Sequence, residues 1–346
     1  MKINFYDLSF EQVEQLIVNE FKEPFFRAKQ IWEGVYKNLW YLPEDFSNIP
    51  KQLREKLWES ISFQSISPLK TLESNDQETI KILFQLNDHK AIETVLMKYD
   101  KRNTLCISTQ AGCAMGCVFC ATGQMGFKRH LSAGEIIEQV MFFARDLKLM
   151  DEKVTNIVMM GMGEPFHNYD ATMTAIDRLS DTNGLGLGAR RFTVSTVGLV
   201  PMIKRFADEN RQTNLAISLH AVDDNERSQL MPVNKKYPIH DVIEACKYYV
   251  QKTNRRITFE WALIAGKNDS EKTAQQLANL LKGLLCHVNA IPLNPTNQFL
   301  YQASNKDQTL KFQKVLEKNG IPCTIRLRRG IDINAGCGQL AIHHQD

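Results

Sequence analysis

The sequence contains no apolar run that approaches the roughly 20 residues needed to cross a bilayer. Its first residues also lack the basic start, the apolar stretch and the small-residue cleavage site of a secretory signal. These absences argue against a membrane protein and against a secreted one, and they predict a cytoplasmic protein with no membrane partner. In that reducing compartment we expect the eight cysteines to bind metal or to perform chemistry rather than to form a disulfide framework.

The sequence also lacks a strong excess of either charge. Lys and Arg total 42 and Asp and Glu total 39, so the formal net charge of +3 does not by itself demand a polyanionic partner. There is no internal repeat of short period and no low-complexity tract. A chain of 346 residues can bury a sizeable core, and we expect one large catalytic domain with a smaller appendage.

The N-terminal part of the chain differs in periodicity from the rest. Residues 1–75 place apolar side chains at helical spacing, with Pro43 and Pro50 as breaks, and predict a small helical accessory domain. Residues 76–98 instead alternate apolar and polar positions around Asn87-Asp88, which predicts a connecting hairpin.

Residues 99–332 alternate between strand-like and helix-like segments. The apolar runs that precede helix-like segments are 104–109, 156–160, 191–195, 214–219, 256–263 and 286–291. Such alternation predicts an α/β fold with a parallel sheet that closes fully or partly into a barrel. Catalytic groups would then lie in the loops after the carboxyl ends of the strands. A C-terminal segment, 333–346, follows this core.

Three cysteines follow the first strand of the repeating unit. Cys113, Cys117 and Cys120 are separated by three and then two residues, a spacing that favours metal binding. Zinc is the weaker interpretation, because no fourth Cys or His lies at a conventional spacing. A 4Fe-4S cluster with three thiolate ligands leaves one iron open to substrate. Three ordinary buried thiols are the plain alternative, which the tight spacing disfavours.

This CxxxCxxC spacing is the signature of the radical-SAM superfamily, and other motifs narrow the resemblance. The chain resembles the RlmN/Cfr family of RNA adenine methyltransferases over most of its length after the N-terminal domain. The segments that carry this resemblance are 106–113, 123–131, the Gly-Met-Gly-Glu-Pro loop at 161–165, and 330–340 with its Gly-Cys-Gly sequence.

The resemblance implies a partial (βα)6 radical-SAM barrel with a small N-terminal helical domain that adds an RNA-binding surface. It also implies a 4Fe-4S cluster on Cys113, Cys117 and Cys120, with S-adenosyl-L-methionine (SAM) at the open iron. The SAM contacts that it carries over are Gly163, Glu164, Ser195, Ser218, Leu219, His220 and Asn294. Any one of these residues could simply be a polar residue at the end of a strand. Successive strand ends of a barrel converge on one mouth, so their shared position supports a single site.

Two further cysteines are implied in the reaction. By the resemblance, one SAM methylates Cys337, and a second SAM yields a deoxyadenosyl radical that takes hydrogen from that methyl group. The resulting carbon adds to the base, and Cys106 resolves the adduct through a transient disulfide with Cys337. The route suits carbon 2 or carbon 8 of adenine, which is electron-poor and not a nucleophile.

Other interpretations of these residues remain. Cys106 and Cys337 could be packing thiols, as we expect for Cys246, Cys286 and Cys323. Glu93 corresponds to the general base of the family. Its residue type alone would instead predict a solvent-exposed position on a strand, because most carboxylates are exposed.

The regiochemistry follows from local sequence. The 126–135 segment and Pro165 after Glu164 resemble the carbon-2, RlmN type, which acts on 23S ribosomal RNA and some transfer RNAs. Ile331-Asp332-Ile333 departs towards the carbon-8, Cfr type, which confers resistance to ribosome-targeting antibiotics. We predict the carbon-2 type, with an electron donor such as flavodoxin or ferredoxin and a monomeric state.

Local basic pairs are the candidate RNA contacts. They occur at 128–129, 190–191, 235–236 and 255–256, and a basic tail at 326–329 precedes the Cys337 segment. Several are expected to flank the barrel mouth and to neutralise phosphates, although any single pair could be a solvated face. Two rival functions are an RNA-binding protein with a structural metal and an iron-sulfur electron carrier, which would need a fourth cysteine ligand.

Overall fold

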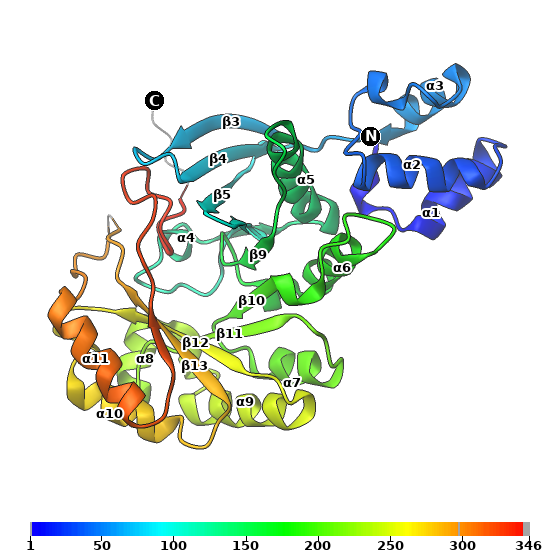
Figure 1. Cartoon of the computed structure of the whole chain (residues 1–346). Coiled ribbons are helices and arrows are strands. Elements are labelled where there is room, and N and C mark those ends of the chain that lie inside the picture. Colours follow the sequence, from blue (N-terminus) through cyan, green and yellow to red (C-terminus); the bar gives the residue numbers. More distant parts are fainter. Residues whose placement is uncertain (1, 297, 342–346) are drawn as a thin grey trace.

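The computed structural model describes residues 2–296 and 298–341, and its centre is a series of parallel strands (Figure 1). Each strand pairs in parallel with the next in chain order. The strands are β6 (Arg102–Cys106), β9 (Asn156–Met159), β10 (Phe192–Thr196), β11 (Asn214–Ser218), β12 (Ile257–Leu263), β13 (Cys286–Pro292) and β14 (Cys323–Ile325). The first six correspond to the predicted apolar runs, and β14 is an additional strand that the sequence analysis did not identify.

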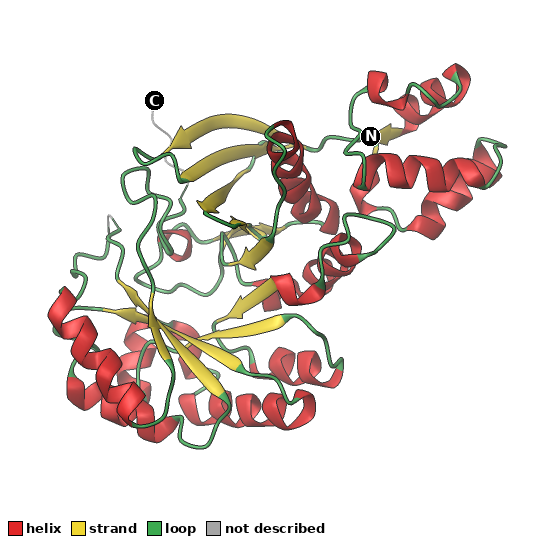
Figure 2. Ribbon diagram, in the orientation of Figure 1, coloured by secondary structure: helices red, strands yellow, loops and turns green. Residues whose placement is uncertain are grey.

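One long helix follows each of the first six parallel strands and covers the outer face of the sheet, as Figure 2 shows. These helices are α5 (Ala133–Leu149), α6 (Tyr169–Ser180), α7 (Val200–Asp208), α9 (Ile239–Thr253), α10 (Glu271–Leu280) and α11 (Lys306–Lys318). The described sheet is open, with β14 at one edge. The predicted partial (βα)6 barrel is therefore confirmed.

Three antiparallel strands extend the same sheet beyond β6. They are β5 (Ala91–Tyr99), β4 (Thr79–Leu86) and β3 (Ile66–Glu73), and β3 forms the second edge. The predicted hairpin thus forms as β4 and β5, but it belongs to the central sheet. Helical structure was predicted as far as residue 75, and that is wrong for β3. Pro68 fits an edge strand because it has no N–H to donate, and the β3–β4 register shifts beside it.

The N-terminal helices form as predicted and pack around aromatic side chains. They are η1 (Phe5–Asp7), α1 (Phe10–Gln15), η2 (Leu16–Glu20), α2 (Phe26–Tyr36), η3 (Pro43–Phe46) and α3 (Lys51–Ser60). Two short strands, β1 (Ile3–Asn4) and β2 (Ile61–Ser62), pair in parallel and close this unit. Trp32, Tyr36 and Phe46 are buried in its core. The unit lies beside α5 and α6 (Figure 1), where Asp7 Oδ1 accepts a hydrogen bond of 2.6 Å from Gly134 N.

The remaining short elements lie in the loops between strands and helices. They are β7 (Gln110–Gly112), α4 (Ala121–Gln124), β8 (Phe127–His130), η4 (Pro165–Asn168), η5 (Ala189–Arg191), α8 (Asp224–Leu230) and η6 (Pro232–Lys235). None of the described helices is long and apolar enough to cross a membrane.

The C-terminal segment leaves β14 and returns to the antiparallel end of the sheet, beside β3 and β4 (Figure 1). Residues 342–346 of the predicted segment 333–346 lie outside the described residues. The chain's last described residues thus lie against strands from its first hundred.

Candidate active site

The three-cysteine loop is held at both ends by a small antiparallel ribbon. β7 pairs with β8, and Cys113 N donates to Gly126 O at 3.1 Å. Gly112 has a φ of +74°, and a Cβ there would lie 1.9 Å from Gly126 O, so only glycine fits. Inside the loop, Cys120 N donates to Cys117 O at 3.2 Å. The ribbon therefore fixes where the three thiols lie.

The thiols of Cys113, Cys117 and Cys120 line one cavity at the carboxyl ends of the strands. Burial raises the pKa of Cys113 to about 12 and that of Cys117 well above its ordinary value, because a lone buried thiolate is unfavourable. Among the described residues, no three His, Cys, Asp or Glu side chains converge as the ligands of a single ion. In a 4Fe-4S cluster each thiolate binds a different iron, so its ligands do not converge on one point.

The Gly161–Pro165 loop follows β9 and lines the same cavity. A Cβ at Gly161 would lie 2.6 Å from Ile107 O, and one at Gly163 (φ +103°) would lie 2.6 Å from Gln110 Cβ. These glycines are therefore required by close packing of the loop on the chain's own residues.

Glu164 is buried in this loop. Its backbone N–H donates to Gln110 Oε1 at 2.8 Å, and its carboxylate accepts hydrogen bonds from Phe166 N at 3.0 Å and Val197 N at 2.9 Å. Burial raises the pKa of Glu164 to about 7, although these donors favour the charged form. A positively charged ligand in the cavity would favour the charged carboxylate.

The predicted strand-end residues mostly reach the cavity. Ser195, Ser218, His220 and Asn294 line it, whereas Leu219 is fully buried in the core and contributes no side chain to the lining. His220 Nδ1 accepts a hydrogen bond of 2.9 Å from Ala262 N, so Nε2 carries the proton of the neutral ring. Burial lowers the pKa of His220 to about 3, which keeps this neutral form.

A fully buried arginine that the sequence analysis missed holds the loops after β10 and β11 in place. Arg227 donates to Val197 O at 2.7 Å, Ser218 O at 3.1 Å and Leu219 O at 3.1 Å. A single arginine in a charged helix gives no sequence signal of such burial. Arg227 therefore holds cavity-lining loops in place, although it is not among the described residues that line the cavity itself.

A second cavity beside the first contains two more thiols, those of Cys337 and Cys106. Both line it together with Arg326, and Cys337 also lines the cavity of the three-cysteine loop. Cys337 as a whole residue is exposed, but its thiol is desolvated where it borders these two cavities. Burial raises the pKa of Cys106 to about 12 and that of Cys337 to about 11, while Arg326 lowers both. Arg326 was expected to contact RNA, but it is half-buried and lines the same cavity as the two thiols.

Glu93 lies in a third cavity, with Lys81 and Ala341. It is 4 % exposed, so the alternative of a solvated strand residue is wrong. Its Oε1 pairs with Lys81 Nζ at 2.9 Å, and its Oε2 accepts from Ala341 N at 2.9 Å. Among the described residues, Glu93 does not line the two cysteine cavities.

Asn294 and Glu260 are polar groups with unusual environments in the first cavity. Asn294 Nδ2 donates to Cys337 O at 3.0 Å, but its buried Oδ1 has no hydrogen-bond partner among the described residues. An unpaired buried amide oxygen is costly, and a donor on a bound ligand would satisfy it. Glu260, which the sequence analysis missed, accepts from Asn289 Nδ2 at 2.7 Å, and burial raises its pKa to about 6. The three thiols, Asn294 and the carboxylates fit a cluster with a zwitterionic, amine-bearing ligand.

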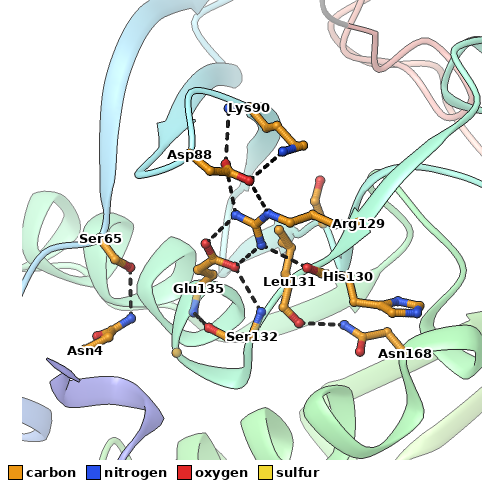
Figure 3. Close-up of polar contacts among 12 residues, drawn as sticks. Asn4, Ser65, Asp88, Lys90, Arg129, His130, Leu131, Ser132, Glu135 and Asn168 are labelled. Atoms are coloured by element: carbon orange, nitrogen blue, oxygen red, sulfur yellow. Dashed lines mark hydrogen bonds and ion pairs between the residues drawn. The ribbon is translucent and has the colours of Figure 1, made fainter. Parts of the chain in front are cut away.

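The basic pairs do not all flank the mouth. Residues 190–191 and 255–256 precede β10 and β12, so they lie at the opposite end of the strands. Arg129 lies between two carboxylates (Figure 3), with bonds of 2.7 Å to Asp88 Oδ2 and 2.7 Å to Glu135 Oε2. These bonds tie the β4–β5 turn to the start of α5. Lys128 and Arg328 remain exposed on the strand-end side.

Comparison with known proteins gives the class and then the family. The sequence model of the Radical SAM superfamily matches residues 107–278, and that of the ribosomal RNA large subunit methyltransferase N-terminal domain matches residues 3–62. Together with the partial barrel and its three-cysteine loop, these matches define a radical-SAM enzyme that uses a 4Fe-4S cluster and SAM.

Relatives along nearly the whole chain then define the family. A protein of Clostridium tetani named "Probable dual-specificity RNA methyltransferase RlmN" is 47% identical over 98% of this chain and 95% of its own length. "Dual-specificity RNA methyltransferase RlmN 1" of Myxococcus xanthus is 46% identical over 97% of this chain and 94% of its own length. The chain belongs to the RlmN family of radical-SAM RNA methyltransferases.

A solved structure supports the same conclusion. A radical SAM methyltransferase from Sphaerobacter thermophilus matches with a TM-score of 0.95 and 47% identity, covering 98% of this chain and 99% of that chain. The likeness therefore includes the N-terminal helical unit as well as the barrel.

Proposed function

We propose that this chain methylates carbon 2 of a specific adenosine in 23S ribosomal RNA and of an anticodon-loop adenosine in some transfer RNAs. The observation that carries the proposal is the place of Cys337, which lines both the cavity of the three-cysteine loop and the cavity that holds Cys106. A thiol at that junction can receive a methyl group on one side and deliver it on the other. The names of the relatives, dual-specificity RNA methyltransferases, support RNA as the substrate.

The cofactors occupy the first cavity in this proposal. Cys113, Cys117 and Cys120 hold the 4Fe-4S cluster, and the SAM contacts are Gly163, Glu164, Ser195, Ser218, Leu219, His220 and Asn294. The cluster and SAM, when bound, supply the radical that removes a hydrogen atom from a methyl group. Since Leu219 is a core residue, its contact is made by backbone atoms.

The chain's own thiols carry the methyl group. The Cys337 thiol first loses its proton, and the resulting thiolate attacks the methyl carbon of SAM. The new bond joins the sulfur of Cys337 to that carbon, the bond between the carbon and the sulfonium breaks, and S-adenosylhomocysteine leaves. Arg326 favours that thiolate, because its positive charge lowers the pKa that burial has raised.

After the methyl carbon has bonded to the base, the adduct carries one unpaired electron, which the cluster would take back in this proposal. Glu93 takes the proton from the base carbon. Because Glu93 is not among the described residues that line the two cysteine cavities, its contact with Ala341 N has to open for this step.

Cys106 then releases the product. Its thiolate attacks the Cys337 sulfur, the bond between that sulfur and the base-bound carbon breaks, and the electron pair stays with the carbon. That carbon takes up a proton and becomes the methyl group of the product. The Cys106–Cys337 disulfide must be reduced by an external thiol before the next turnover.

The surroundings of the reaction follow from the same proposal. We infer a cytoplasmic enzyme that acts as a monomer and takes its electrons from a flavodoxin or a ferredoxin. The exposed Lys128 and Arg328 at the strand-end side would neutralise RNA phosphates near the mouth. The target base would leave its stack to enter the cavity of Cys106 and Cys337.

The experiment that tests this proposal is an anaerobic incubation of the cluster-loaded enzyme with SAM, a reductant and an unmodified 23S RNA fragment. Mass spectrometry of the digested nucleosides reads the result. We expect 2-methyladenosine. Methylation at carbon 8 would assign the chain to the antibiotic-resistance chemistry, and deoxyadenosine without a methylated base would remove RNA adenine as the substrate.

A further inference from the structure

The segment that carries Cys337 is attached to the sheet at two points, one on each side of that cysteine. Lys81 Nζ donates to Asn334 O at 3.0 Å, three residues before Cys337. Glu93 Oε2 accepts from Ala341 N at 2.9 Å, four residues after it. The lysine and the carboxylate are themselves paired at 2.9 Å, so one ion pair holds both ends of the segment.

The strands explain why these two side chains meet. In the β4–β5 ladder Leu83 lies opposite Glu93, so Lys81 is the diagonal neighbour of Glu93 on the same face of the sheet. Their side chains are only 5% and 6% exposed. Both therefore hold a fixed geometry, and both point to the face over which the C-terminal segment crosses.

A buried ion pair is a weak source of stability, because desolvation of both charges offsets their attraction. Such a pair can, however, fix the orientation of a neighbouring segment, because charged donors and acceptors make short, strong hydrogen bonds to its backbone. Here Lys81 and Glu93 each form one such hydrogen bond with the backbone of the Cys337 segment. The residues between these ends are attached separately. Ala121 N donates to Gly338 O at 2.7 Å, Asn294 Nδ2 to Cys337 O at 3.0 Å, Thr122 Oγ1 to Leu340 O at 2.6 Å, and Gln339 Nε2 to Pro295 O at 3.0 Å.

The geometry points to a clamp: Lys81 is a positioning residue that, together with Glu93, fixes both ends of the 334–341 segment and so holds the Cys337 thiol at the junction of the two cavities. This inference rests on the proposed role of Cys337 as the methyl carrier. It adds Lys81 to the residues of the reaction. It also gives Glu93 a second task, because its Oε2 is occupied by Ala341 N while the clamp is closed.

Thiol accessibility tests the clamp without any turnover. The cluster-loaded enzyme is treated with iodoacetamide in the absence of SAM and RNA, and the alkylation rate of the unmethylated Cys337 peptide is followed by mass spectrometry. We expect Lys81→Met to raise that rate by about tenfold, since loss of a charged hydrogen bond shifts local opening by that order. Lys81→Arg should restore most of the protection.

Two controls separate a clamp from general destabilisation. Cys246 is fully buried in α9, so its alkylation in the same sample reports global unfolding and should not change. Lys70 lines the same cavity from β3, and Lys70→Met removes a charge there. That variant should alkylate at the wild-type rate. If Lys81→Met fails to fold, the double variant Lys81→Met/Glu93→Gln, which leaves no lone buried charge, replaces it.

A folded Lys81→Met enzyme with wild-type alkylation of Cys337 would overturn the clamp. Equal acceleration of Cys337 and Cys246 would overturn it too, because it would show only general loosening. In the RNA assay the variant should lose kcat with an unchanged KM for RNA. If Cys337 is alkylated as expected in each variant but the wild-type enzyme yields no 2-methyladenosine, the proposed function is refuted and the clamp stands.

Discussion

At the residue scale, the decisive feature is the surroundings of two thiols. Cys337 and Cys106 share a cavity with Arg326, whose charge lowers pKa values that burial raises to about 11 and about 12. A thiol with such a pKa is a poor nucleophile until a nearby charge or ligand stabilises its thiolate. The raised pKa values therefore favour the protonated thiols while the cavity is empty.

Separate tasks for the two cysteines predict different failures on substitution. Cys337→Ala should abolish all methylation, because no carrier remains. Cys106→Ala should allow the adduct to form but not to resolve, which leaves RNA covalently attached to the protein. Denaturing gel electrophoresis of labelled RNA distinguishes the two. Free RNA with normal product from Cys106→Ala would remove its assigned role.

At the element scale, helix α5 joins the N-terminal unit to the barrel. It begins with a capping box between Ser132 and Glu135, and Glu138 on its next turn is almost fully buried. The Glu138 carboxylate accepts hydrogen bonds from Ser65 N at 2.8 Å and 2.9 Å and from Ser65 Oγ. It thus holds the chain where the helical unit passes into β3.

Glu138 gives the fold a dependence on pH whose sign follows from its pKa. Burial raises that pKa from 4.5 to about 7, so the folded protein favours the protonated acid. The contribution of Glu138 to the free energy of unfolding is largest below pH 4.5, falls between pH 4.5 and 7, and is lost above pH 7. Glu138→Gln should flatten this decline by up to about 3 kcal/mol.

Urea denaturation at pH 5 and pH 7.5 measures this difference. The exposed carboxylate of Glu55 provides a matched control, since Glu55→Gln should leave the wild-type pH dependence unchanged. A Glu138→Gln protein that loses stability with pH as steeply as wild type would contradict the assignment.

The elements also show what sequence patterns can predict. The six strand runs, the N-terminal helices and the strand-end cavity followed from periodicity and from the three-cysteine motif. Strand β3 was missed because an edge strand with Pro68 lacks clean alternation. Lys81, Arg227 and Glu260 were missed because each acts through distant partners, and an isolated charge in a strand or helix normally indicates a solvent-facing side chain.

At the scale of the whole molecule, the site is assembled from both ends of the chain. The barrel strands supply the first cavity, and the C-terminal segment crosses from β14 to β4 and β5 to bring Cys337 beside it (Figure 1). Basic pairs lie at both ends of the strands, but only those at the carboxyl ends are near these cavities. We therefore expect the RNA base to enter from the strand-end side.

The central claim is that the methyl group passes through Cys337 and loses one hydrogen there. Incubation with unmodified RNA and SAM that carries a trideuterated methyl group tests this most directly. The account predicts that, over several turnovers, the product methyl group keeps two deuterium atoms and takes one hydrogen from solvent, while the third deuterium appears in deoxyadenosine. A methylated adenosine that retains all three deuterium atoms would contradict the account, because it would show direct transfer from SAM.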